Sequence, residues 1–129
     1  MKLTGKLEVT SWHEDDLESL SADEGRTTSA KIGYALTGDV VGTASGDVAM
    51  HYLPDGTASV VGLLRVVGSI GEKSGGIVFQ SVGGYDGTTA TGDLTTVPGA
   101  GSGDFSATAG TGRTSATSET ASYQFELEI

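Results

Sequence analysis

Arg65 is the ionisable side chain whose surroundings in the sequence most invite a chemical role. It lies within Val60–Val67, where apolar residues occupy both alternating positions of a β-strand. One face of that strand would carry Val60, Leu64 and Val66, and the other Val61, Leu63 and Val67. A charge in a strand without a solvated face is expected to be paired or to bind something. Arg65 could form an ion pair with Glu14 or Asp47, stack on a Tyr or Trp ring, or anchor an anion or carbonyl group of a ligand.

Glu14 is the second candidate for chemistry, because it follows Trp12 closely in the sequence. Burial of a carboxyl beside an indole would raise its pKa, and a raised pKa would let Glu14 act as a general base. Trp12 has two interpretations: the aromatic wall of a binding site, or a plug in the core or at its rim. Glu14 and Arg65 are therefore the two candidates for a catalytic role.

Three polar side chains further along the chain are candidates for binding a ligand: His51, Tyr52 and Gln80. Tyr52 shares the strand parity of Val48 and Met50, which also suits a core position. His51 shares the parity of Asp47, which suits a polar pair. The predicted ligand-binding residues are Trp12, His51, Tyr52, Arg65 and Gln80.

Several other chemistries are disfavoured. The chain has no Cys and only 2 His, which excludes disulfides and thiolate metal sites and disfavours a transition-metal site. The acidic segment Glu14–Glu24 lacks the fixed spacing of a calcium loop, so we interpret it as solvated charge. There is no Gly-x-Ser-x-Gly motif, and Gly99–Gly103 lacks the spacing of a dinucleotide motif. We expect no metal and no cofactor.

Charge and hydropathy limit the partners. The 17 carboxylates against 7 Lys and Arg give a net charge of −10, which disfavours nucleic acid and anionic membranes as partners. No apolar run approaches the roughly 20 residues of a membrane-spanning helix. Met1–Gly5 does not look like the start of a signal peptide, so we expect a cytoplasmic protein.

The elements that must position these residues are all predicted to be strands. Apolar and polar residues alternate at both ends of the chain, and no helical periodicity of useful length occurs. We expect eight strands, at about 2–12, 26–37, 40–53, 57–70, 76–83, 88–97, 111–117 and 121–129. Pro54-Asp55-Gly56 and Asp86-Gly87 predict tight turns, and an ordered glycine-rich turn is expected around Phe105. The fold class is all-β: residues 1–129 form one closed eight-stranded antiparallel barrel, with the first strand beside the last.

Much of the chain resembles a bacterial family of domains of unknown function with an allene-oxide-cyclase-like barrel fold. The stretches that carry the resemblance are Glu8–Trp12 with Glu14, Tyr52 with Pro54–Gly56, Val61–Gly68, Ser74–Gln80, Asp86-Gly87 and Pro98–Gly112. The resemblance implies the same closed barrel, usually as a dimer or larger assembly. Members of this general fold with known activity guide cyclisations or couplings inside an apolar cavity. The family itself brings no settled activity.

Two functions remain open. The first is a barrel that binds a small apolar or amphipathic ligand, with a possible cyclase- or isomerase-like activity. The alternative is a non-catalytic oligomeric module whose barrel is plugged by its own side chains. An extracellular, dirigent-like role is disfavoured by the N-terminal sequence and the lack of Cys. In both cases we expect a homodimer that uses the second face of the strand Val60–Val67.

Overall fold

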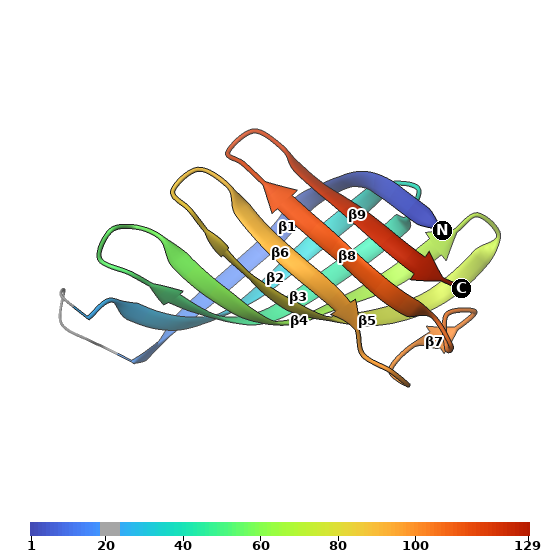
Figure 1. Cartoon of the computed structure of the whole chain (residues 1–129), viewed down its shortest axis with the longest axis horizontal. Coiled ribbons are helices and arrows are strands. Elements are labelled where there is room, and N and C mark those ends of the chain that lie inside the picture. The colour runs from blue at the N-terminus through green and yellow to red at the C-terminus, as the bar shows by residue number, and fades with distance from the viewer. Residues whose placement is uncertain (19–23) are drawn as a thin grey trace.

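The computed structural model is a closed antiparallel β-barrel, and it describes residues 1–18 and 24–129 (Figure 1). Eight long strands form the ring, as the sequence predicts, and a two-residue strand lies beside it. The strands are β1 (Lys2–Glu18), β2 (Arg26–Gly38), β3 (Val41–Tyr52), β4 (Ala58–Ile70), β5 (Lys73–Tyr85), β6 (Ala90–Thr96), β7 (Ser102–Gly103), β8 (Ala109–Ala116) and β9 (Ala121–Glu128).

The ring closes where the first and last long strands meet. Around the barrel the order is β4-β3-β2-β1-β9-β8-β6-β5, and β5 pairs again with β4. Lys2 pairs with Glu126 and Lys6 with Ser122, and the ammonium group of Met1 donates a hydrogen bond to the carbonyl of Leu127 at 2.9 Å. Both chain ends therefore lie at the same end of the barrel (Figure 1).

The first strand is longer than predicted. Residues 14–18 of the expected acidic loop Glu14–Glu24 continue β1, because β2 pairs with them from Thr27 onward. Residues 19–23 of that segment lie outside the described residues.

A β-bulge at Thr10 decides which side chains of β1 face the interior. Val9 pairs with Tyr34 and Ser11 with Gly33, so Thr10 has no partner on β2. Strict alternation from Leu3 would turn Trp12 outward. The extra residue instead turns Trp12 toward the inner face, where it pairs with the buried Ile32 and lines the mouth of the barrel while remaining 52 % exposed.

One half of the barrel, the end that holds the chain termini, is filled by side chains. The rings of Phe79 and Phe125 lie 5.0 Å apart between centroids, and those of Tyr123 and Phe125 lie 4.7 Å apart. Phe105, in the glycine-rich turn, is only 2 % exposed and packs in the same core, which confirms that the turn is ordered. We call this part the packed half; its core also contains Leu3, Leu36, Val40, Val66, Ile77 and Leu127.

The two faces of β4 are separate, as predicted, but the second face is uncovered in the single chain. Val66 is 2 % exposed and faces the core, whereas Val67 is 55 % exposed on the outer surface. Arg65 also lies on the outer surface and forms no ion pair with Glu14 or Asp47; Asp47 instead lies 3.6 Å from Lys31. No helix long and apolar enough to span a bilayer occurs in residues 1–18 and 24–129.

Candidate functional site

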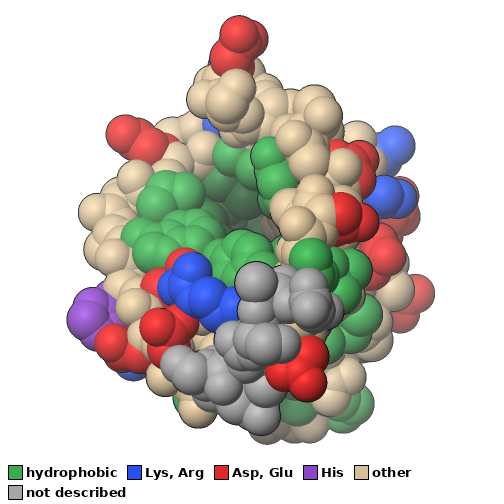
Figure 2. All heavy atoms as spheres, turned by 90° about the vertical axis from the view of Figure 1, so that its left-hand side faces the viewer, with side chains coloured by type: hydrophobic (Ala, Val, Ile, Leu, Met, Phe, Trp, Pro, Cys, Tyr) green, Lys and Arg blue, Asp and Glu red, His purple; other side chains and the backbone are tan. Residues whose placement is uncertain are grey.

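The other half of the barrel encloses a cavity of about 340 Å³. It opens at the end opposite the chain termini. Figure 2 shows this end, where hydrophobic side chains surround a hollow and acidic side chains lie around it. We call this part the hollow half.

Side chains do not fill the hollow half, because one of its walls is built mainly from small residues. The positions that face the cavity from β5, β6, β8 and β9 include Ser81, Gly83, Gly92, Thr114, Ala116 and Ala121. Gly83 admits nothing larger, since a Cβ there would lie 1.8 Å from the carbonyl oxygen of Thr91. Close strand contact thus keeps this wall thin and the cavity open.

The opposite wall comes from β1 to β4 and is built from larger apolar residues: Leu7, Ile32, Val48, Met50 and Val60. Tyr34 lies in this wall, between this cluster and the core of the packed half. Its hydroxyl has no hydrogen-bond partner among the described residues, and burial raises the pKa of Tyr34. The sequence-based candidates did not include Tyr34, although its parity with Ile32 and Leu36 places it on the inner face.

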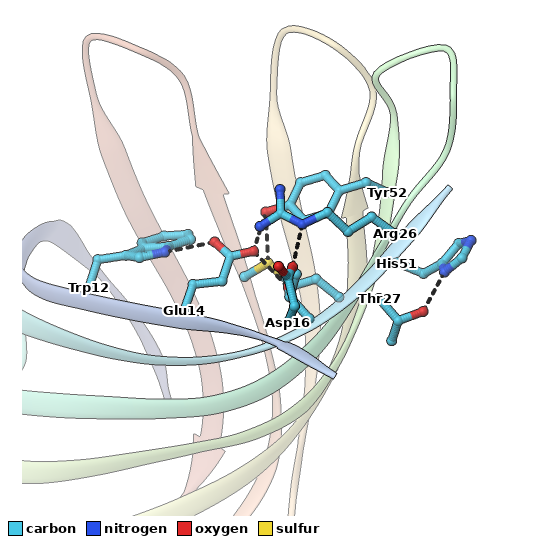
Figure 3. Close-up of polar contacts among 9 residues, drawn as sticks. Trp12, Glu14, Asp16, Arg26, Thr27, His51 and Tyr52 are labelled. Carbon is cyan, nitrogen blue, oxygen red and sulfur yellow. Dashed lines mark hydrogen bonds and ion pairs between the residues drawn. The ribbon is translucent and has the colours of Figure 1, made fainter. Parts of the chain in front are cut away.

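Glu14 forms the centre of a hydrogen-bonded cluster at the mouth of the cavity (Figure 3). The indole Nε1 of Trp12 donates to Oε1 at 3.0 Å. The hydroxyls of Thr28 and Tyr52 donate to Oε2 at 2.6 Å and 2.9 Å. Trp12 and Tyr52 also line the cavity, so the cluster connects the polar rim to the apolar interior.

Arg26, which the sequence did not single out, adds a cation to this mouth. Its guanidinium forms an ion pair with Asp16 and lies over the ring of Tyr52, 5.6 Å from the centroid (Figure 3). Arg26 and Asp16 neutralise each other, so the cluster retains the negative charge of Glu14.

The pKa of Glu14 is lowered, contrary to the expectation from sequence. Partial burial is the largest influence on this pKa and acts to raise it. The three hydrogen bonds and the charge of Arg26 act in the opposite direction, and together they lower the pKa below its ordinary value of 4.5. Burial and the hydrogen bond to Glu14 both raise the pKa of Tyr52. At neutral pH the site therefore holds an ionised carboxylate, which is a weak base, and a protonated phenol.

The described loops around the mouth carry more acid than base. Asp55, Asp86 and Glu119 lie in the turns at this end and are exposed. Hydrogen bonds from Thr57 lower the pKa of Asp55, and those from the backbone N–H groups of Thr89 and Thr88 lower the pKa of Asp86, so both are ionised at neutral pH. The rim of the cavity is thus negatively charged.

The structure brings together three of the predicted site residues: Trp12, Glu14 and Tyr52. The other three, His51, Arg65 and Gln80, face the outer surface, which corrects their assignment to the cavity. His51 Nδ1 lies 2.8 Å from the hydroxyl of Thr27, and Arg65 and Gln80 are exposed. Each has the parity opposite to the inward residues of its own strand.

The fold and this cavity define a class: a small closed β-barrel with one packed end and one hollow, acid-rimmed end. The chain belongs to the family described as "Protein of unknown function (DUF3224)", whose model matches residues 3–127. This confirms the resemblance to a family of unknown function; the likeness to allene oxide cyclases stays a prediction.

A solved structure supports the same fold. It is a DUF3224 protein of unknown function from Shewanella oneidensis MR-1, which is 21 % identical, with a TM-score of 0.83 over 100 % of this chain and 97 % of the other. At that identity the likeness shows the fold alone. None of the curated proteins matches the chain.

Proposed function

We propose that this protein binds a small, largely apolar molecule, neutral or positively charged, in the hollow half of its barrel. The observation that carries the proposal is the cavity of about 340 Å³, open at one end and enclosed by the strands. Its volume falls within the range of ordinary small-molecule sites, roughly 300–1,000 Å³.

The wall of the cavity selects an apolar body. Ile32, Met50 and Leu64 face the cavity and are shielded from bulk water. Each methylene group that a ligand buries against such a wall contributes about 0.8 kcal/mol. Tyr34 offers a polar contact there, because its hydroxyl is free to donate to or accept from a group on the ligand, and the hydroxyls of Ser81 and Thr114 face the cavity from the opposite wall.

The mouth selects the charge of the ligand's polar end. Glu14 is ionised and lies beside the cavity lining, and the surrounding turns add Asp55 and Asp86. A carboxylate on the ligand would be repelled there, whereas an alcohol or an ammonium group would be accepted. Trp12 and Tyr52 add aromatic surface against which a cation can lie.

We place binding ahead of catalysis. A cyclase- or isomerase-like reaction could be guided by the cavity shape and by the hydroxyl of Tyr34. Glu14, however, already accepts three hydrogen bonds and has a lowered pKa, which makes it a poor general base. The alternative, a non-catalytic module whose barrel is filled by its own side chains, agrees with the packed half. The cavity of the hollow half, which side chains do not fill, favours the binding proposal.

The test uses three small-molecule probes that have alkyl chains of the same carbon number and differ in their polar group: decyltrimethylammonium, decanol and decanoate. Trp12 is the only Trp and lies at the mouth, so its fluorescence reports occupancy. We expect the cation and the alcohol to give saturable changes at low ionic strength and decanoate to bind about tenfold more weakly or worse, a difference of about 1.4 kcal/mol. Equal binding of all three would overturn the charge preference.

Two matched variants locate the binding. Ser81→Phe places a ring in the cavity, and Thr95→Phe places the same ring on the outer face of the neighbouring strand β6. We expect Ser81→Phe to abolish the fluorescence change and Thr95→Phe to preserve it, with circular dichroism confirming that both fold. Unchanged binding in a folded Ser81→Phe variant would refute the cavity as the site.

A further inference from the structure

The outer face of β3, β4 and β5 is the most apolar part of the described surface away from the mouth. Val61, Leu63, Val67 and Val82 are 52 %, 42 %, 55 % and 61 % exposed. Val61 pairs directly with Val82 and neighbours Leu63 on the outer face of β4, so these three side chains form one area. Val67 follows on the same face beyond Arg65. Exposed apolar residues that are contiguous mark interaction surfaces more often than single ones do.

This face also carries little charge for so acidic a chain. The outward positions of β3, β4 and β5 include a single carboxylate, Asp47, and a single cation, Arg65. The outer face of β1 and β9, by contrast, carries Lys2, Lys6, Glu8, Glu126 and Glu128. A second copy, itself with a net charge of −10, meets the least repulsion on the face with one carboxylate.

Arg65 and Asp47 give this face a complementary pair. Ser45 pairs with Arg65, and Asp47 pairs with Leu63, so Arg65 and Asp47 lie on a diagonal of two adjacent strands. Arg65 has no ion-pair partner among the described residues, and Asp47 has only the exposed Lys31 at 3.6 Å. Arg65 thus remains available to a partner, and Asp47, whose carboxylate has two oxygens, can accept a second cation beside Lys31.

We propose that a second copy of this chain docks on this face to form a two-fold homodimer. In face-to-face packing the two-fold axis lies in the interface. Consider a two-fold axis that lies in the plane of this face, crosses the line from Arg65 to Asp47 at its midpoint and is perpendicular to that line. Rotation about this axis places each Arg65 opposite the Asp47 of the other copy. Leu63 then lies close to the axis and meets its own counterpart, with Val61 and Val67 beside it. The two cavities stay open, because they face the end of each barrel and not its side (Figure 2).

The experiment is a charge exchange measured by analytical ultracentrifugation of the full chain. We expect the wild type to be a dimer at micromolar concentration and Arg65→Asp to weaken association at least tenfold, because two carboxylates then face each other. Asp47→Arg should do the same, and the double variant Arg65→Asp/Asp47→Arg should restore the dimer. Lys6→Asp, a matched reversal on the outer face of β1, should leave the dimer intact.

A monomeric wild type would overturn the proposal. A dimer that survives both Arg65→Asp and Leu63→Asp would place the interface elsewhere and would also overturn it. If the single variants dissociate but the double variant does not reassociate, the opposition of Arg65 to Asp47 is wrong. Binding of the probes is measured in parallel by Trp12 fluorescence. Because the homodimer is inferred independently of the ligand, the dimer proposal and the binding proposal can each be refuted while the other stands.

Discussion

The two halves of this barrel are made by the same strands and yet have opposite interiors. Along β5 the inward side chains change from Phe79 in the packed half to Ser81 and Gly83 in the hollow half. Along β9 they change from Phe125 to Ala121. The strands of both halves belong to the same ring, so on β5 and β9 the size of the inward side chains decides whether the interior is a core or a cavity. The large buried side chains are therefore concentrated at one end, and the cavity lies at the other.

Two tyrosines repeat this contrast in their hydrogen bonds. In the packed half the hydroxyl of Tyr123 donates to the carbonyl of Thr37 at 2.8 Å and accepts from the backbone N–H of Val40 at 2.9 Å. In the hollow half the hydroxyl of Tyr34 has no partner among the described residues. A buried polar group that is satisfied supports the fold, whereas a free one is available to a ligand.

The largest expected effect on the free energy of unfolding comes from a substitution in the packed half. Phe125→Ala should lower the free energy of unfolding by about 3–5 kcal/mol, because it removes the ring that packs against both Phe79 and Tyr123. Met50→Ala, in the cavity wall, should cost about 2 kcal/mol, since its surroundings are already partly empty. Urea unfolding at one protein concentration measures both values. Equal costs would show that stability is shared evenly between the halves.

The next largest effect is expected from removing the hydroxyl group of Tyr123, in contrast to that of Tyr34. Tyr123→Phe should cost about 1–3 kcal/mol, because the buried N–H of Val40 loses its acceptor. Tyr34→Phe should leave the free energy of unfolding nearly unchanged and weaken decanol about fivefold, if the alcohol reaches that hydroxyl. The same unfolding and fluorescence titrations provide the readouts. A strongly destabilised Tyr34→Phe would contradict the view of Tyr34 as a free group.

The smallest effect concerns pH at the mouth. The pKa of Glu14 is lowered in the folded protein, so its contribution to stability is present above about pH 4.5 and is lost as the pH falls through the lower folded pKa. We expect the melting temperature of Glu14→Gln to lie slightly below that of the wild type at pH 7 and to converge with it in acid. A gap in melting temperature that grows as the pH falls would reverse the sign and refute this view of Glu14.

The sequence predicted the architecture well, but it predicted less well which side chains face the interior of the barrel. Alternation at both ends of the chain was enough to predict a ring of eight strands with its ends joined, because the period of 2 is a local property. Arg65 was misjudged because a strand with apolar residues on both faces does not reveal which face turns inward, or that the other remains exposed in the single chain. Arg26 was missed because its role depends on its cross-strand neighbours Asp16 and Tyr52. Tyr34 could be placed on the inner face by parity, but the sequence does not show that the surrounding side chains leave its hydroxyl without a partner.

The bulge at Thr10 separates the part of β1 that serves the packed half from the part that serves the mouth. From Gly5 to Val9 and from Ser11 to Asp16 the pairing with β2 is regular, so the extra residue is accommodated locally; a second register shift follows between Asp16 and Glu18. A chain without Thr10 would therefore keep Leu7 in the interior and Trp12 at the mouth, now on a straight strand. Losing this one residue would alter the bend of the wall and leave intact both the core of the packed half and the inward side chains at the mouth.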